Sequence, residues 1–249
     1  MIRHLLQLIW NQRKQNAWLW AELLLVSVFL WFLVDYLYVM GRTYTAPLGF
    51  DIRHTYSIVI SSLSERSPDY IPKEKRERPD GVHLLTALDR IRTYPGVESA
   101  CLTDGGMPYY MGSRNLVWRI DTLQVPCRYA FVTPEFFDVF RIYDKDGKTA
   151  SLKRAIEDNN SIVISADVET MNPGLSLLGQ KAYRGNVTDE IEETIRGISV
   201  PIRRHEYTKA EPNVYRALRL SRMEEGYYEG MIDAVRLCVR VRPDVDNAD

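Results

Sequence analysis

Residues Trp18 to Met40 read WLWAELLLVSVFLWFLVDYLYVM, an apolar run whose only charged residues are Glu22 and Asp35. As a helix rising about 1.5 Å per residue, this run is roughly 35 Å long, enough to cross a hydrocarbon core about 30 Å thick. A buried core helix seldom lacks a polar face, and the apolar region of a cleaved signal peptide is shorter, about 7 to 15 residues. The sequence therefore predicts an uncleaved transmembrane helix over residues 18–40.

The segment before this run is basic. Residues 1–17 include Arg3, Arg13 and Lys14 but neither Asp nor Glu. Because basic flanks stay on the cytoplasmic side of a membrane, we expect a cytoplasmic N-terminus and a periplasmic location for residues 41–249.

Four apolar residues of the first segment share one helical face. Ile2, Leu5, Leu6 and Ile9 recur at i, i+3, i+4 and i+7. Such a face can rest on the membrane surface or contact a partner protein, and the segment can also simply extend the spanning helix. The sequence leaves these readings open.

Glu22 and Asp35 are the charged residues inside the span. Each lies within one or two turns of an end, so we expect their carboxylates to reach the head groups. A role in transport is the alternative, although the span holds no His, Lys or second carboxylate near either of them.

Composition excludes several classes of protein. The net charge is -1 with 26% charged residues, which gives no indication of nucleic-acid binding. No later run reaches about 18 apolar residues, so one span is expected. Three distant cysteines, Cys101, Cys127 and Cys238, exclude a zinc ribbon or a disulfide scaffold; they are expected as buried thiols, or as one bridge in an oxidising compartment.

The remainder of the chain alternates strand and helix patterns, which predicts an α+β fold in two lobes. A helix is expected from Asp80 to the stop at Pro95, and a short helix should point Phe136, Val139 and Phe140 inward. The segment KDGKTASLKRAIEDNN (145–160) is polar and predicted to be mobile. The predicted strands are TYSIVISS (55–62), VESACLT (97–103), NLVWRID (115–121), VPCRYAFV (125–132), SIVISADVE (161–169), ETIRGISVPIRR (193–204) and DAVRLCVRVRPD (233–244).

The last predicted strand alternates strictly. Its two sets of residues are Val235, Leu237, Val239 and Val241, and Arg236, Cys238, Arg240 and Arg242. The alternation predicts one face in the core and one in solvent, with the arginines solvated. Binding of an anionic ligand by the arginine row is the alternative.

No motif for chemistry is present. The sequence lacks GxxxxGK[ST], which would cradle phosphate, and it lacks HExxH and GxSxG. We therefore expect a non-enzymatic protein with no cofactor, no metal site and no catalytic residue.

A series of short segments in residues 94–218 resembles the sequence pattern of a known family. FVTPEFFDVFRI (131–142), NSIVISADVE (160–169) and LLGQKAY (177–183) occur in this order, preceded by YPGVESA (94–100) and followed by IRGISVPIRR (195–204) and EPNVYRAL (211–218). In order and spacing they resemble the periplasmic core domain of MacB/FtsX-type ABC transporter permeases.

The resemblance implies a fold and a role. The fold would be the first transmembrane helix followed by a two-lobed periplasmic domain over 41–249, with a βαβ-like lobe at about 50–112 and 228–243 and an inserted lobe at about 113–227. Segments 55–61 and 235–241 should then share one sheet, with Ile58 and Val239 in one core. The role would be that of a homo- or heterodimeric permease subunit of the bacterial inner membrane, which relays ATP-driven movement of a cytoplasmic ATPase to export or extract peptides, lipoproteins or drugs.

The chain also departs from the family pattern. Family permeases carry three further transmembrane helices after this domain, so the sequence is expected to be either a truncated permease or a reduced form. The alternative functions are a single-pass anchored periplasmic sensor or binding protein, and an adaptor without transport activity.

Overall fold

The structure, a computed structural model, describes residues 17–110, 112, 114–185, 190–228 and 232–245 together with Arg3, Gln7, Trp10 and Lys14, the side chain of Lys73 excepted. The chain divides into two compact units, Met1–Ala46 and Pro47–Asp249.

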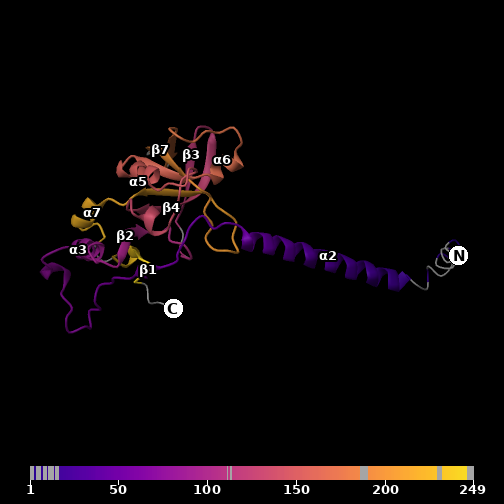
Figure 1. Cartoon of the computed structure of the whole chain (residues 1–249), viewed down its shortest axis with the longest axis horizontal. Helices are drawn as coiled ribbons and strands as arrows, with labels where there is room; N and C mark the ends of the chain where they lie inside the picture. The colour runs from indigo at the N-terminus through magenta and orange to yellow at the C-terminus, as the bar shows by residue number, and fades with distance from the viewer. Residues whose placement is uncertain are drawn as a thin grey trace. The chain divides into compact units, whose positions relative to one another are not determined.

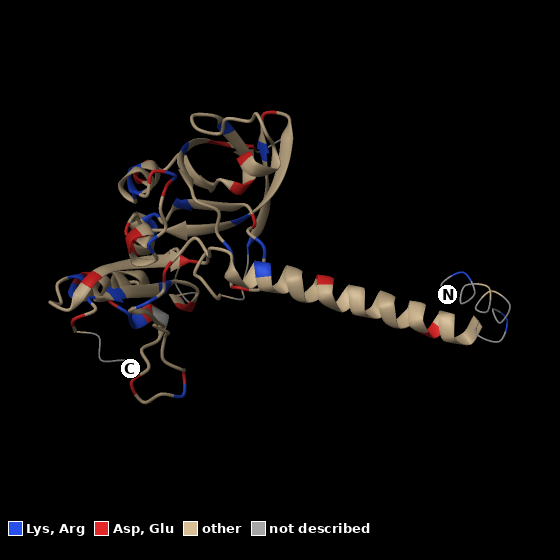
Figure 2. Cartoon of the chain, turned by 45° about the vertical axis from the view of Figure 1, so that its right-hand side comes forward, with Lys and Arg blue, Asp and Glu red and all other residues tan. Residues whose placement is uncertain are grey.

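The first unit contains the predicted helix, α2 (Ala17–Thr45), which extends a few residues beyond 18–40. Its 29 residues reach about 43 Å at the usual rise, and none of its side chains is buried within the protein. It is the one helix in the described ranges that is long and apolar enough to cross a membrane. Its charged residues are Glu22, Asp35 and Arg42. The rest of the helix is tan in Figure 2, the colour of residues other than Lys, Arg, Asp and Glu.

The second unit is a mixed α/β domain, as predicted. Its helices are η1 (Lys73–Lys75), α3 (Asp80–Arg92), α4 (Phe136–Val139), α5 (Ala150–Glu157), α6 (Asp167–Met171), α7 (Leu220–Glu224) and η2 (Ile232–Ala234). Its strands are β1 (Thr55–Ile58), β2 (Val97–Asp104), β3 (Asn115–Ile120), β4 (Leu123–Val132), β5 (Ser161–Ser165), β6 (Lys181–Arg184), β7 (Ile191–Ser199), β8 (Asn213–Ala217) and β9 (Arg236–Val241). Figure 1 places α3, α7, β1 and β2 at one end of this unit and α5, α6, β3 and β7 at the other.

Strands β1, β9 and β2 form an antiparallel group in that order. The first strand after α2 therefore pairs directly with the last strand of the chain, with Tyr56 opposite Val239. This confirms that segments 55–61 and 235–241 share a sheet. Ile58, however, is 38% exposed, and Ile60 packs instead against the cluster that contains Val239. The strand ends at Ile58, so the prediction for that side chain was wrong.

The other six strands close into a ring, in the order β4, β3, β6, β7, β5, β8 and back to β4. The β5–β7 and β4–β8 pairs are parallel, and the remaining pairs are antiparallel. Ring closure leaves no unpaired edge, and the interior is filled by apolar side chains that include Trp118, Ile164 and Ile195. The ring strands lie within the range predicted for the inserted lobe, and the lobe boundaries themselves stay a prediction.

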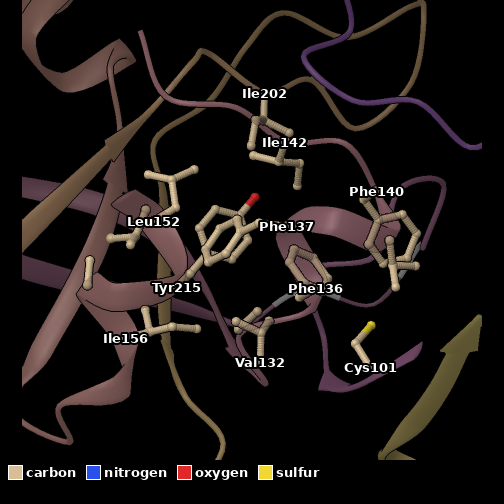
Figure 3. Close-up of a cluster of buried hydrophobic side chains, with 14 of the residues drawn as sticks. Cys101, Val132, Phe136, Phe137, Phe140, Ile142, Leu152, Ile156, Ile202 and Tyr215 are labelled. Carbon is tan, nitrogen blue, oxygen red and sulfur yellow. The ribbon is translucent and has the colours of Figure 1, made fainter. Parts of the chain in front are cut away.

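The three-stranded group continues into the ring through an antiparallel pairing of β2 with β4, where Thr103 lies opposite Val132, and an apolar cluster packs between the two. The cluster contains Cys101 and Cys238 from β2 and β9, Tyr215 from β8, and the rings of α4. Figure 3 shows Phe136, Phe137 and Tyr215 gathered at its centre, and the Phe136 and Tyr215 centroids are 5.4 Å apart. Burying an aromatic side chain contributes roughly 1.5–3 kcal/mol, so this cluster holds the two groups of strands together as one unit.

The predicted mobile segment 145–160 is wrong in its middle. Residues 150–157 form α5, which buries Leu152, Ala155 and Ile156 against β5 and β7. These residues recur at i, i+3 and i+4, which is a helical face, although a short one set among polar residues.

Candidate functional site

Of the six residues singled out from the sequence, the structure describes two, Glu22 and Asp35. Ile2, Leu5, Leu6 and Ile9 lie outside the described residues. Glu22 and Asp35 are both exposed on α2, and their separation of 13 positions corresponds to about 20 Å along a helix and about 220° around it. A shared carboxylate site is therefore excluded by geometry.

The last strand differs from its prediction. Leu237 and Val239 enter one apolar cluster and Cys238 enters another, so both faces of β9 are buried. Arg240 itself is only 2% exposed, and the prediction of a solvated arginine face fails at this residue.

The burial of Arg240 is compensated by backbone carbonyls, because each of its three guanidinium nitrogens donates a hydrogen bond to one of them. Nε donates to Val139 O at 2.7 Å, Nη1 donates to Arg53 O at 2.8 Å, and Nη2 donates to Asp51 O. Burial lowers the pKa of Arg240, and the neighbouring charge of Arg141 lowers it further. We call this arrangement the carbonyl clamp.

The carbonyl clamp fixes the segment that follows α2. Leu48 O accepts from Arg203 N at 3.0 Å, and Asp51 N donates to Phe140 O at 2.9 Å. Gly49 has φ +84°, and a Cβ there would lie 2.1 Å from Pro201 O, so only glycine fits this close approach. The segment is thus held at several points before β1 begins.

The three cysteines are free and buried, in agreement with the buried-thiol expectation. Cys101 and Cys238 face each other across the β2–β9 pair. Burial raises the pKa of Cys127 to about 12, and burial followed by the contact with Cys238 raises that of Cys101. Neither thiol is a nucleophile in the folded state.

A second feature is a cleft of about 440 Å³ between one end of the strand ring and the α7–η2 segment. We call it the arginine cleft. Its charged lining residues are Arg114, Arg184, Arg216, Arg219, Arg222 and Asp104, and its aromatic ones are Phe131, Tyr227 and Tyr228. A smaller pocket of about 230 Å³ adjoins it through Asp104 and Arg114 and contains Arg128.

Two of the cleft arginines share one buried carboxylate. Glu193, 2% exposed, accepts from Arg216 Nε at 2.8 Å, and its other oxygen lies 3.5 Å from Arg184 Nε. That second oxygen and Arg184 Nε have no hydrogen-bond partner among the described residues. Burial lowers the pKa of Arg216; the charge of Glu193 opposes this, while Arg184 adds to it.

The positive charges of the remaining cleft arginines are less fully compensated by carboxylates in the described residues. Arg114 pairs with Asp104 at 2.6 Å, whereas neither Arg219 nor Arg222 has a carboxylate partner in the described part of the chain. Arg222 lies over the Tyr227 ring at 5.3 Å. Burial raises the pKa of Asp104, opposed by the charge of Arg114.

Tyr228 keeps its proton in this cleft. Burial raises its pKa to about 12, with the charge of Asp104 as the next cause. Its hydroxyl is therefore a hydrogen-bond donor at neutral pH.

Sequence reasoning missed the arginine cleft because its residues come from distant segments. A local signal exists in RALRLSRMEEGYYEG (216–230), where Arg216, Arg219 and Arg222 recur every three residues and precede Tyr227 and Tyr228. That pattern shows that arginines cluster, but it does not show what they face.

Comparisons with known proteins found similar folds only among solved structures. No family model matches the chain. No curated protein matches it either.

Three solved structures resemble the chain. A domain of a protein described as a permease, from Porphyromonas gingivalis, is 21% identical with a TM-score of 0.45, and the match covers 65% of this chain and 62% of that one, less than two thirds of its length. The periplasmic region of MacB from Actinobacillus actinomycetemcomitans is 10% identical over 83% of this chain and 82% of that one, with a TM-score of 0.44. The extracellular domain of the ABC-type transporter YknZ from Gram-positive bacteria is 12% identical over 76% and 85%, with a TM-score of 0.44.

The chain is similar in fold to periplasmic and extracellular domains of ABC-type permeases, the family that its sequence motifs resemble.

Proposed function

We propose that the chain is a membrane-anchored, permease-like subunit of an ABC transporter of the MacB/FtsX type. Its helix α2 anchors it in the bacterial inner membrane, with residues 1–17 in the cytoplasm and residues 47–249 in the periplasm. The subunit relays movement of a partner ATPase to the periplasmic side for the export or extraction of peptides, lipoproteins or drugs. It works as a homo- or heterodimer.

The carbonyl clamp is the observation that carries this proposal. A relay needs the segment that leaves the membrane helix to be fixed to the domain that moves. Here the carbonyls of Asp51 and Arg53 are bonded to a buried guanidinium of β9, and β1 pairs with that same strand. Displacement of residues 51–53 therefore pulls on a strand in the middle of a sheet and not on a loose loop.

The energy source lies in the partner. The sequence has no phosphate-cradling loop, so the chain does not itself hydrolyse ATP. Residues 1–17 are the part placed on the cytoplasmic side, and we assign the partner contact to the face of Ile2, Leu5, Leu6 and Ile9.

A second function is favoured by the arginine cleft. A single-pass anchored binding or sensor protein needs a pocket with converging polar groups, and the cleft, at about 440 Å³, lies within the usual size of small-molecule sites, roughly 300–1,000 Å³. This role and the relay are compatible, since the clamp and the cleft use different residues.

Topology gives the first test. Protease added to spheroplasts should digest residues 47–249 and leave a tag on Met1 protected. The reverse pattern refutes the orientation and the relay together.

Co-purification gives the second test. The double variant Leu5→Ser and Ile9→Ser should lose a co-purifying ATPase subunit, because two apolar contacts are removed from the proposed face. The matched control, Gln7→Ser and Asn11→Ser, changes two polar residues of the same segment and should retain the subunit. Equal retention by both variants refutes a protein contact at this face, and ATPase activity of the chain after removal of every other protein refutes the non-enzymatic role.

A further inference from the structure

The lining of the arginine cleft has a large excess of positive charge. Among the described residues, five guanidinium groups and one carboxylate, that of Asp104, line it, and Glu193 pairs with two of the guanidiniums. Arginine does not lose its proton at physiological pH, so these charges persist. Like charges held this close repel one another, and an anion in the cleft would relieve that repulsion.

The least compensated charges lie together on one short stretch. Arg219 directly precedes α7 and is half-buried, and Arg222 is one turn further along. Neither has a carboxylate partner in the described residues, and both line the cleft. Arg219 is also close enough to Arg216 to lower the pKa of that side chain. Their N–H groups are thus the donors that a bound anion can use.

The cleft also has apolar lining residues. Phe131, Leu218 and Tyr227 line it together with the arginines, and the Phe131 ring packs under the Arg216 guanidinium at 4.9 Å. A small hydrated inorganic anion would leave these apolar side chains without a contact. The combination of guanidiniums and apolar side chains fits an anionic group attached to an apolar or ring-shaped moiety.

We propose that the arginine cleft binds a phosphate-bearing ligand, with the phosphate held by Arg219 and Arg222 and its attached group lying along Phe131, Leu218 and Tyr227. A phosphate monoester offers three acceptor oxygens and close to two negative charges, which suits several converging guanidiniums, whereas a carboxylate is satisfied by one bidentate arginine. The inference concerns the cleft alone and holds whether or not the chain takes part in transport.

The test uses the full chain in micelles of a non-ionic detergent and titration calorimetry with three probes. Dihexanoyl phosphatidic acid carries a phosphate monoester with acyl chains, glycerol 3-phosphate carries the same group without them, and dihexanoyl phosphatidylcholine has the chains but a zwitterionic head. We expect phosphatidic acid to bind and phosphatidylcholine not to bind. Weaker binding of glycerol 3-phosphate assigns the site to a lipid-like ligand, and equal binding assigns it to a free phosphomonoester.

Variants identify the site. Arg219→Gln and Arg222→Gln should each lower the affinity for phosphatidic acid about tenfold, the effect of losing one charge-assisted hydrogen bond. Asp104→Asn should raise the affinity, because it removes a carboxylate from the lining. Arg154→Gln is the matched control: Arg154 is exposed on α5, donates to Ala150 O of its own helix, does not line the cleft, and should leave the affinity unchanged.

The outcomes are decisive because Arg219 and Arg222 make no ion pair in the described part of the chain whose loss would unfold it. An unchanged melting temperature in both variants verifies this. Wild-type affinity in the Arg219→Gln and Arg222→Gln variants would overturn the proposal, as would equal binding of phosphatidylcholine and phosphatidic acid.

Discussion

Replacing Arg240 with Met tests the carbonyl clamp directly. Methionine fills much of the same volume and keeps the apolar stem, but it donates no hydrogen bond. The substitution removes three charge-assisted bonds, those to the carbonyls of Asp51, Arg53 and Val139.

The expected change in the free energy of opening is the sum of opposing effects. Hydrogen bonds to a charged group contribute about 1.5–3 kcal/mol each, and a buried acceptor left without a donor costs about 1–3 kcal/mol. Against this, removal of a buried charge relieves its desolvation. The carbonyl of Arg53 belongs to an exposed residue and can turn to water, so we expect a net loss of about 3 kcal/mol, equivalent to roughly a hundredfold in the opening equilibrium.

Thiol labelling of the reduced chain under native conditions measures that opening. Cys101 and Cys238 are fully buried beside the clamp, and Cys127 is 1% exposed inside the strand ring. Each reacts only after it is exposed, so the labelling rate reports the local opening constant. In the Arg240→Met variant, Cys101 and Cys238 should react about a hundredfold faster, and Cys127 should be affected less because it lies in the closed ring.

Arg242→Met is the matched control, two residues further along the same chain. Arg242 is exposed, and its ion pair with Asp244 is long at 3.8 Å, so its loss should change stability by less than about 1 kcal/mol. Labelling of Cys238 at the wild-type rate in Arg240→Met would refute the clamp. An equal acceleration by Arg242→Met would show that the effect is not specific to the buried guanidinium.

Two further predictions concern other parts of the same domain. A Cβ on Gly81 would lie 2.4 Å from Met223 O, so Gly81→Ala should push α3 away from α7, cost about 1–3 kcal/mol in thermal stability and weaken phosphatidic acid binding; an unchanged melting temperature would show that α7 shifts freely. Burial raises the pKa of Asp144, but bonds from Ser151 and two backbone N–H groups outweigh it and leave the pKa below its usual value. The carboxylate therefore contributes stability above its unfolded pKa, about 3.9, and loses it as pH falls below that, so Asp144→Asn should flatten the fall in the urea midpoint between pH 5 and 3. A parallel fall in both proteins would contradict this.

Unbroken apolar runs in the sequence predicted several elements that the structure confirms. The run 18–40 is apolar around its whole circumference and became α2. The predicted strands 97–103 and 161–169 contain the uninterrupted runs ACLT (100–103) and IVI (162–164), which lie in β2 and β5, because a strand segment buried on both faces needs no alternation. These signals are local, so no tertiary information was needed to find them.

Short patterns failed for a physical reason. Helix α5 spans eight residues, of which three are buried, and its remaining residues are as polar as a loop. A helix of this length is stable only because its apolar face packs against β5 and β7. The sequence of the helix itself gives no sign of this packing.

The closure of the strand ring also could not be predicted from local sequence patterns. The sequence indicated strands in the range 113–227, but the parallel pairing of β4 with β8 joins Ala130 to Tyr215 across a long stretch of chain. Loop length and hydrophobic pattern restrict such pairings without selecting one of them.

The arginines show most clearly what a sequence pattern leaves undecided. Arg240 lies in an alternating strand and Arg219 lies in a loop before a helix; the alternation at Arg240 predicted a solvated side chain, and the spacing of Arg216, Arg219 and Arg222 did not show what Arg219 faces. The two arginines differ in the hydrogen-bond acceptors that lie within reach of their guanidinium groups. The Arg240 guanidinium is buried and each of its nitrogens donates to a backbone carbonyl, whereas Arg219 lines a cavity and has no carboxylate partner in the described chain. Since those acceptors belong to residues far away in sequence, only the folded arrangement distinguishes an arginine that holds the structure from one that is available for binding.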